Sequence, residues 1–288
     1  MEDYIKKNFS AERALYGKED LILVECSFSG EEDGESAIKE ANNVETYKTF
    51  FDLRYPLWHC KKIDMKECNL SKNCRAPLWY CKDINIYSTE ILGVKALRES
   101  KNILLDNCKI SSEEFCWKNK KIKANNISVE GNYSFFECQN MDIDEMYLNG
   151  KYSFQYVKNV KIANSNFDTK DAFWHSTNVT LRNCVIDGEY LGWYSKGLTL
   201  INCKIKGTQP LCYCENLKLI NCEMEDCNLA FEYSSVKATI KGKIKSIKNP
   251  KKGKIVVDYV EKVYITDDSK YPCKAYVDTK NGLNELIW

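Results

Sequence analysis

Short runs in which apolar and polar residues alternate recur along the chain at a nearly constant interval. The clearest runs follow the pattern N-h-x-h-x-N-C-x-h, with h apolar, and one of them begins with Gly; they are 102–110, 178–186, 197–205 and 216–224. The first apolar residue of each run falls at Leu21, Val44, Ile63, Ile84, Ile103, Ile122, Met141, Val160, Val179, Leu198, Leu217 and Val236. The last eight intervals are all 19 residues, which indicates a structural repeat.

The length of the repeat limits the fold. A helical-hairpin repeat needs roughly 33 residues or more. A leucine-rich repeat has a compatible length, but it requires L-x-x-L-x-L-x-x-N/C-x-L, and here two alternating runs surround a bend instead. The pattern therefore predicts an all-β, single-stranded right-handed parallel β-helix, a solenoid of about twelve coils, each made of three short strands joined by tight turns.

Positions within a coil are numbered from the first apolar residue, column 0. Columns 0 and +2, and columns +5 and +7, alternate as inward-facing strands, and column −6 is predicted to supply a third inward side chain. Glycines recur at column +9, which predicts a turn with positive φ, and asparagines at columns −1 and +4 predict two bends. Column +5 is cysteine in six coils: Cys26, Cys68, Cys108, Cys184, Cys203 and Cys222.

The repeat is absent from both ends of the chain. We expect residues 1–20 to form an N-terminal cap, residues 21–244 to form the β-helix, and residues 245–288 to form a C-terminal cap segment. A cap would cover the open edge of the last coil, which otherwise invites association.

Charge and composition exclude several classes of partner. The chain has 42 basic and 41 acidic residues, so it lacks the basic surplus of a nucleic-acid-binding protein. No apolar run is long enough to span a membrane, and residues 1–7 lack the apolar core of a signal peptide, which predicts a cytoplasmic protein.

The 15 cysteines are therefore expected to be reduced thiols. No Cys-x-x-Cys motif occurs, so the sequence predicts no metal site and no cofactor. A metal or redox role for the column +5 cysteines is conceivable because they stack coil upon coil, but we favour small buried hydrophobes that fill the interior.

Aromatic residues gather at two adjacent columns. Five of the six tryptophans lie at column −5, and the next column contains His59, Tyr80, His175 and Tyr194. Because column −6 points inward, column −5 should point outward. Such a stripe is typical of a surface on which sugar rings stack, and equally of an aromatic ladder that stabilises its own sheet or is covered by a cap or a second subunit. Homo-oligomerisation through this face or an end cap is therefore also considered.

Charged residues on the same face suggest where a ligand and catalytic groups would lie. An acidic oligosaccharide would contact the aromatic columns and three arginines; the predicted ligand-binding residues are Arg54, Trp58, His59, Arg75, Trp79, Tyr80, Arg98, Trp117, Trp174, Trp193 and Tyr194. The candidate acid–base residues are Asp171, His175 and Glu99. For each single charge, a solvated surface residue is the simpler interpretation.

Several longer segments carry a family resemblance: 12–17, 33–37, 52–59, 95–99, 151–156, 169–175, 188–194 and 207–213. Over roughly residues 8–260 the chain resembles a bacterial family of short, pectin-lyase-like, right-handed β-helix proteins. The resemblance implies the fold and no known activity. The polygalacturonase signatures Asn-Thr-Asp, Gly-His-Gly and Arg-Ile-Lys are missing, as is the aspartate cluster of pectate lyases.

Two functions therefore stay open. The first is carbohydrate binding or processing on the aromatic face; an enzyme would be a polysaccharide lyase or glycoside hydrolase by analogy of fold alone. The alternative is a non-catalytic scaffold or protein-interaction solenoid.

Overall fold

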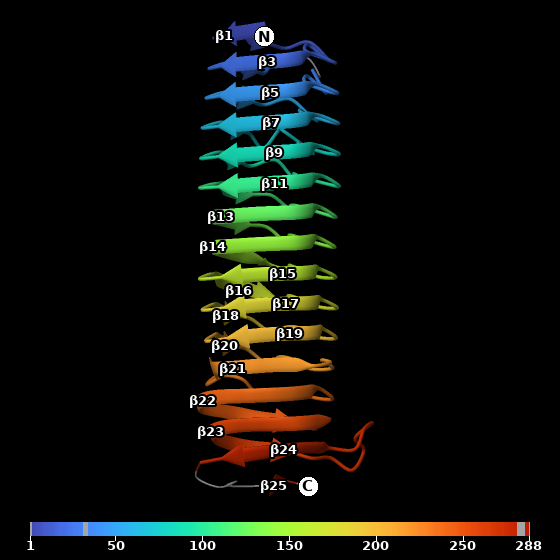
Figure 1. Ribbon diagram of the computed structural model, residues 1–288, viewed down its shortest axis with the longest axis vertical. Helices are drawn as coiled ribbons and strands as arrows, with labels where there is room; N and C mark the ends of the chain where they lie inside the picture. Colours follow the sequence, from blue (N-terminus) through green and yellow to red (C-terminus); the bar gives the residue numbers. More distant parts are fainter. Residues whose placement is uncertain (1, 31–33, 281–285, 288) are drawn as a thin grey trace. The chain divides into compact units, whose positions relative to one another are not determined.

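The computed structural model describes residues 2–30, 34–280 and 286–287. It divides into two compact units, Met1–Tyr147 and Leu148–Trp288. Every regular element in the described residues is a β-strand (Figure 1), so the described part contains no helix that could span a membrane.

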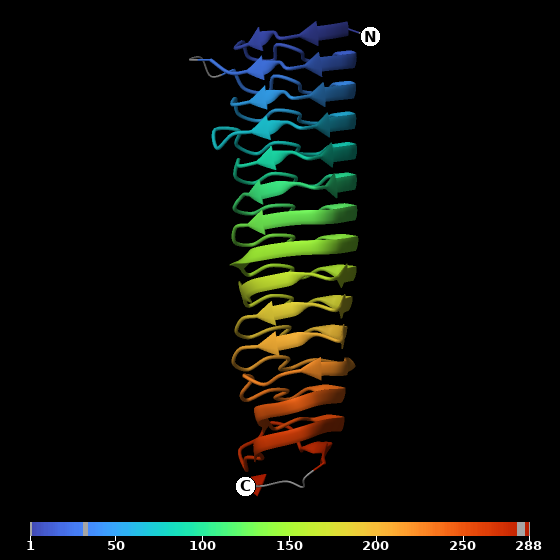
Figure 2. The same ribbon diagram turned by 90° about the vertical axis from the view of Figure 1, so that its left-hand side faces the viewer.

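The strands of the first unit alternate between longer and shorter members (Figure 2). They are β1 (Glu2–Ile5), β2 (Asn8–Phe9), β3 (Glu19–Val24), β4 (Ser27–Phe28), β5 (Asn42–Tyr47), β6 (Phe50–Phe51), β7 (Lys61–Lys66), β8 (Asn69–Leu70), β9 (Lys82–Tyr87), β10 (Glu90–Ile91), β11 (Lys101–Asp106), β12 (Lys109–Ser111) and β13 (Lys120–Glu130). β14 (Gln139–Lys151) spans the boundary between the units.

The second unit continues in the same manner, with longer strands near its C-terminal end. Its strands are β15 (Lys158–Ala163), β16 (Asn166–Lys170), β17 (Thr177–Arg182), β18 (Val185–Asp187), β19 (Lys196–Ile201), β20 (Lys204–Lys206), β21 (Leu217–Glu223), β22 (Ser235–Lys248), β23 (Lys252–Tyr264), β24 (Lys274–Thr279) and β25 (Leu286–Ile287).

Parallel pairing of each strand with its counterpart one repeat later makes both units β-solenoids. In the first unit column 0 is in register from β3 to β13, with Leu21 opposite Val44 and Ile103 opposite Ile122. In the second, Val160 lies opposite Val179. The predicted all-β parallel solenoid with a 19-residue repeat is confirmed, with about 14 turns rather than twelve.

The interior is filled by the predicted inward columns. Column 0 and +2 residues such as Ile84 and Ile86 are fully buried, as are column +7 residues such as Phe28 and Phe51, whose rings stack at 5.0 Å. The column −6 residue Leu57 is buried as well. Because the apolar side chains of each inward column lie above one another in successive turns, apolar surface is removed from water along the whole length of each unit.

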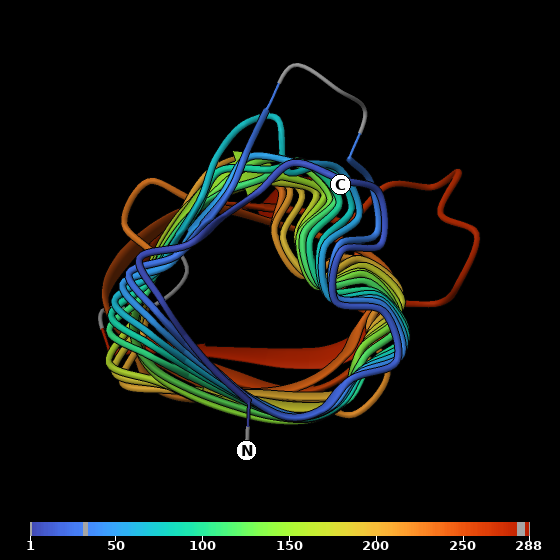
Figure 3. The same ribbon diagram turned by 90° about the horizontal axis from the view of Figure 1, so that it is seen from above.

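The third side of each turn differs from the predicted third strand (Figure 3). Columns −8, −6 and −4 have positive φ, as at Tyr55 (54°), Leu57 (58°) and His59 (56°). The amide of Tyr55 donates to the carbonyl of Arg75 one turn on, and that of His59 donates to Trp79, both at 2.9 Å. Bonds between turns therefore hold a backbone that L-residues otherwise avoid.

The asparagine columns behave as predicted, and the glycine column only in part. Asn183 and Asn202 have φ of 53°, and the side-chain amide of Asn202 donates to the side-chain oxygen of Asn183 at 3.3 Å. At column +9, however, a Cβ on Gly188 would lie 1.8 Å from the carbonyl oxygen of Thr169. Glycine is required there because backbone turns approach closely, and positive φ is not needed at Gly188.

Strands in both expected cap segments pair with strands of the repeat, and the division into caps and β-helix stays a prediction. β1 pairs with β3, with Glu2 opposite Leu21, so residues 2–20 form a turn of the solenoid. Beyond residue 244, β23 pairs in parallel with both β22 and β24, so coiling continues without the sequence pattern. Residues 1, 281–285 and 288 of the expected caps lie outside the described part.

Candidate functional site

The column −5 tryptophans of the first unit form a ladder whose rings cover one another. Trp58 and Trp79 stack with centroids 5.2 Å apart and planes 5° apart. The indole Nε1 of Trp58 donates to the carbonyl of Ala76 at 2.6 Å, and that of Trp79 donates to Lys95 at 2.5 Å. Both acceptors lie at column −8 of the next turn. The stacked faces and the indole N–H groups are therefore engaged within the protein, and the rings are half-buried.

Arg98 occupies a position of the same ladder. Its guanidinium carbon lies 4.6 Å from the ring centroids of both Trp79 and Trp117. One amino group donates to Glu114 at 2.8 Å, so this arginine is already paired. The indole Nε1 of Trp117 donates to the backbone carbonyl of Tyr133 at 2.6 Å.

The second unit repeats the arrangement. The ring centroids of Trp174 and Trp193 are 5.2 Å apart and their planes 3° apart. Their Nε1 atoms donate to the backbone carbonyls of Tyr190 and Gln209, both at 2.7 Å. The side-chain amide of Gln155, also at column −5, has the same role and donates to the backbone carbonyl of Asp171 at 3.0 Å. Of the two interpretations of the tryptophan stripe, this geometry favours the self-stabilising ladder.

Column −4 forms a second, more exposed ladder. In the first unit His59 stacks on Tyr80 at 4.9 Å. In the second unit the centroids of successive rings are 4.9, 5.0 and 4.7 Å apart from Tyr156 through His175 and Tyr194 to Tyr213. Tyr233, at column −3 of the next turn, follows at 5.7 Å. These five residues are called the tyrosine ladder; Tyr156 and Tyr194 are 45% and 41% exposed.

The candidate acid–base residues have different surroundings. Asp171 is only 6% exposed, and burial raises its pKa, while His175 is exposed between two ring faces. Within the described residues no hydrogen bond or ion pair joins these two. Glu99 is exposed and belongs to the first unit.

The three predicted arginines also have separate surroundings. Arg54 pairs with Glu35 at 3.7 Å and lies 5.5 Å from the Tyr55 ring, whereas Arg75 is exposed at the same column one turn later. Arg98 lies within the tryptophan ladder, and ligand binding by these three guanidinium groups stays a prediction.

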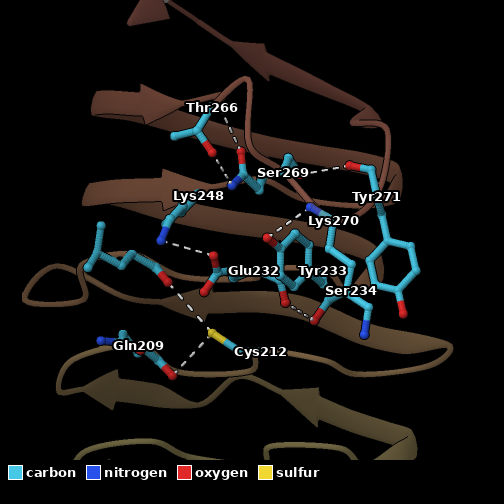
Figure 4. A network of polar contacts seen from close by, with 12 residues as sticks. Gln209, Cys212, Glu232, Tyr233, Ser234, Lys248, Thr266, Ser269, Lys270 and Tyr271 are labelled. Carbon is cyan, nitrogen blue, oxygen red and sulfur yellow. Dashed lines mark hydrogen bonds and ion pairs between the residues drawn. The ribbon is translucent and has the colours of Figure 1, made fainter. Parts of the chain in front are cut away.

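A cleft that the sequence did not predict opens at the end of the tyrosine ladder, and Figure 4 shows three of its lining residues, Tyr233, Lys270 and Tyr271. It has a volume of about 530 Å³. Four tyrosines and three lysines line it: Tyr194, Tyr213, Tyr233, Tyr271, Lys251, Lys252 and Lys270. We call it the tyrosine–lysine cleft. Its signal in the sequence is the lysine- and tyrosine-rich stretch after residue 248, which lies outside the recognisable repeat.

One wall of the cleft is the loop 265–273 between β23 and β24, which Figure 1 shows projecting from the strands. The side-chain oxygen of buried Asn249 accepts a 3.0 Å hydrogen bond from the amide of Thr266, and the amide of Lys270 donates to the Tyr233 hydroxyl at 3.2 Å. The Tyr271 ring meets Tyr233 edge to face at 5.3 Å. The loop is thus held against the tyrosine ladder.

The electrostatics of the cleft favour an anion. The Lys251 and Lys270 ammonium groups lie 4.4 and 5.3 Å from the Tyr271 ring centroid. Burial, with the charge of Glu232 adding to it, raises the pKa of Tyr213 to about 12, so its hydroxyl remains a hydrogen-bond donor at neutral pH. Glu232 itself is paired with Lys248 at 3.0 Å.

A column of lysines in the first unit breaks the usual charge pattern. Acid and base commonly pair between successive turns, as in Lys109 with Glu90 at 3.0 Å. By contrast, Lys61, Lys82, Lys101 and Lys120 lie in register on four consecutive turns, and all are exposed. Like charges opposite one another destabilise a sheet.

The cysteines of the described residues are free thiols, and fourteen of them are buried. The column +5 thiols point inward, where Cys203 Sγ lies 3.5 Å from the carbonyl oxygen of Leu181. Cys60 and Cys81, which share column −3, are buried as well. Among the described residues no group of three or more His, Cys, Asp or Glu side chains is arranged to hold a metal ion.

Three solved structures resemble this chain distantly. QnrB1, a plasmid-mediated fluoroquinolone resistance protein, is 8% identical to this chain. The match covers 76% of this chain and 91% of the QnrB1 chain, with a TM-score of 0.26. HetL, a pentapeptide repeat protein of the cyanobacterium Nostoc, is 9% identical over 78% and 92%, with a TM-score of 0.23. PfbA, a surface adhesin of Streptococcus pneumoniae, is 10% identical over 91% and 72%, with a TM-score of 0.27.

Comparison with curated proteins finds no match. A family profile, in contrast, matches residues 2–278, nearly the whole chain. The chain therefore belongs to the family described as "Protein of unknown function (DUF3737)".

Proposed function

We propose that this protein is a non-catalytic solenoid scaffold that binds other proteins, with the tyrosine ladder of the second unit as its main contact surface. The observation that carries the proposal is a row of stacked rings with exposed edges, which ends in an open cleft. Tyrosine is enriched at protein interfaces because its ring offers large area and its hydroxyl a hydrogen bond.

Rigidity supports the same function. Each ring of the ladder is held by its neighbours, and the backbone beneath it is hydrogen-bonded from turn to turn, as from Tyr194 to Cys212 at 3.2 Å. A partner that docks there immobilises few side chains, so little conformational entropy is lost on binding.

The ring geometry does not favour carbohydrate binding at the tryptophans. A sugar stacks on the face of an aromatic ring, and the facing surfaces of Trp58 and Trp79, and of Trp174 and Trp193, cover each other. The carbohydrate function and the pectin-lyase-like relationship both stay predictions. A cytoplasmic location is proposed as well, since the many free thiols suit a reducing compartment.

The test compares how much of a protein partner is captured by the wild-type protein and by the double variant Tyr156→Ser/Tyr194→Ser. Calorimetric titration with the purified partner then measures the affinity of each. We expect about tenfold or greater loss of affinity, as for central interface tyrosines. Tyr147→Ser is the matched control, because Tyr147 is 49% exposed and lies outside the ladder. Binding or turnover of an oligosaccharide that depends on Tyr156 and Tyr194 would overturn the proposal.

A further inference from the structure

A second hollow adjoins the tyrosine–lysine cleft on the second unit. It has a volume of about 410 Å³, and its lining includes Lys218, Lys237 and Lys252. Asn216, Ser235 and Lys252 line both hollows. The two therefore form one groove, referred to below as the basic groove.

The groove concentrates positive charge in a chain whose net charge is only +1. Five exposed lysines line it: Lys218, Lys237, Lys251, Lys252 and Lys270. Lys218 and Lys237 are opposite one another in register, which costs stability in the absence of an anion. Glu215 is the one carboxylate that the described lining contains, and it pairs with Lys196 at 3.4 Å.

The spacing of these charges suits an extended ligand. Asn216, Ser235 and Lys252 belong to successive turns, which stack about 4.8 Å apart, so the lysines are distributed over roughly 10 Å. An extended polypeptide rises about 3.3 Å per residue, so a run of acidic residues presents several carboxylates over this distance. A single compact anion would reach only one or two of the amines.

The aromatic part of the groove offers edges and hydroxyls. The stacked faces of Tyr194 and Tyr213 cover each other at 4.7 Å, which leaves little ring face for a nucleobase. Their hydroxyls are hydrogen-bond donors suited to carboxylates. The described residues of the lining also include no arginine, the residue most used for bidentate phosphate contacts.

We infer that the basic groove binds an acidic segment of a partner polypeptide, with the lysine ammonium groups pairing with its carboxylates and the tyrosine edges contacting its backbone. This inference rests on the proposed scaffold function, for which it names the class of partner. Loop 265–273 contributes Lys270 and Tyr271, so it forms part of the binding surface. Its carboxylates Asp267 and Asp268 do not line either hollow.

The probe is fluorescein-labelled poly-L-glutamate of about ten residues, followed by fluorescence anisotropy with the full-length protein at two salt concentrations. We expect Lys252→Ala and Lys270→Ala each to weaken binding about fivefold, and the wild-type affinity to fall as salt rises. Lys101→Ala, which removes an equally exposed lysine from the stacked column of the first unit, should change affinity by less than about twofold. Thermal melts of each variant confirm that it folds.

Three results would overturn the inference. The first is no binding of polyglutamate. The second is that Lys101→Ala lowers the affinity for polyglutamate as much as Lys252→Ala does, which would indicate unspecific attraction between the peptide and any exposed lysine. The third is tighter, Lys252-dependent binding of oligouridylate RNA or a sulfated oligosaccharide. If polyglutamate fails while a protein partner still depends on Tyr156 and Tyr194, the scaffold function stands and the acidic-segment inference alone is lost.

Discussion

The guanidinium of Arg98 lies 4.6 Å from the ring centroid of Trp79, at a position where other turns place an indole. Trp117 covers its other face at the same distance, and Glu114 accepts its hydrogen bond. The side chain is only 19% exposed. Arg98 therefore acts as a charged member of the tryptophan ladder, joined to both neighbouring turns.

Replacement of Arg98 tests this structural role. Arg98→Ala removes two cation–π contacts and a charge-assisted hydrogen bond, so we expect the free energy of unfolding to fall by about 2–3 kcal/mol. Arg98→Trp should cost much less, because an indole continues the ladder while Lys95 still pairs with Glu114 at 3.5 Å. Urea denaturation measures both. Equal losses for the two variants would contradict the ladder role.

The indole hydrogen bonds are expected to contribute measurably to stability. Trp174→Phe keeps an aromatic ring but removes the donor to the Tyr190 carbonyl, so we expect a loss of about 1–2 kcal/mol in calorimetric unfolding. Tyr194→Phe is the control, because its exposed hydroxyl makes no hydrogen bond that would be lost in the described structure. A Trp174→Phe protein as stable as the wild type would show that the carbonyl is satisfied by water.

The lysine column of the first unit predicts a stabilising substitution. Lys101→Glu places a carboxylate between Lys82 and Lys120, so two repulsions become attractions. We expect a gain of about 0.5 kcal/mol that shrinks as salt is added. Lys109→Glu, which breaks the ion pair with Glu90, should instead lower the free energy of unfolding. Chemical denaturation at low and high salt provides the measurement.

Thiol reactivity should separate Cys273 from the other cysteines. Cys273 is partly exposed beside β24, whereas the remaining fourteen are buried. Burial raises the pKa of Cys214 to about 11 and that of Cys138 well above its usual range, which keeps these thiols protonated and unreactive. Ellman titration of native protein should therefore detect a single fast thiol, which Cys273→Ser abolishes, and denatured protein should titrate nearly all 15. Rapid labelling of column +5 thiols would contradict their buried position.

Asp171 is expected to lower stability at neutral pH. Burial raises its folded pKa above the ordinary value of 3.8, with Lys170 opposing the shift and Glu189 adding to it. The unfolded carboxyl ionises first, so folding stability falls as pH rises from 3.8 through the raised folded pKa and stays lower above it. Asp171→Asn should therefore be more stable than the wild type at pH 7, and the difference should vanish near pH 3. A less stable Asn variant at pH 7 would indicate an ionic partner for Asp171.

The inward columns, the bends and the free thiols could be predicted from the sequence. Each of these features depends on the 19-residue period, because residues such as Ile84, Cys108 and Asn183 repeat their own environment turn after turn. A solenoid turn contacts mainly its neighbours, so a local pattern specifies most of its packing. The same reasoning placed the tryptophans in one column, but it did not decide which surface of each ring would be free.

Only the tertiary structure determined which surface of each tryptophan ring is free. The distance between stacked indoles, and the hydrogen bond from each indole N–H to column −8 of the next turn, depend on how the third side of the turn bends. That bend needs positive φ angles at residues such as Leu57, whose residue type gives no clear signal of them in the sequence. The tyrosine–lysine cleft was likewise beyond the sequence, because Lys270 and Tyr271 come from a loop outside the repeat and reach Tyr233 only through folding. Periodicity determines which residues stack; contacts between non-equivalent segments arise only when the chain is folded.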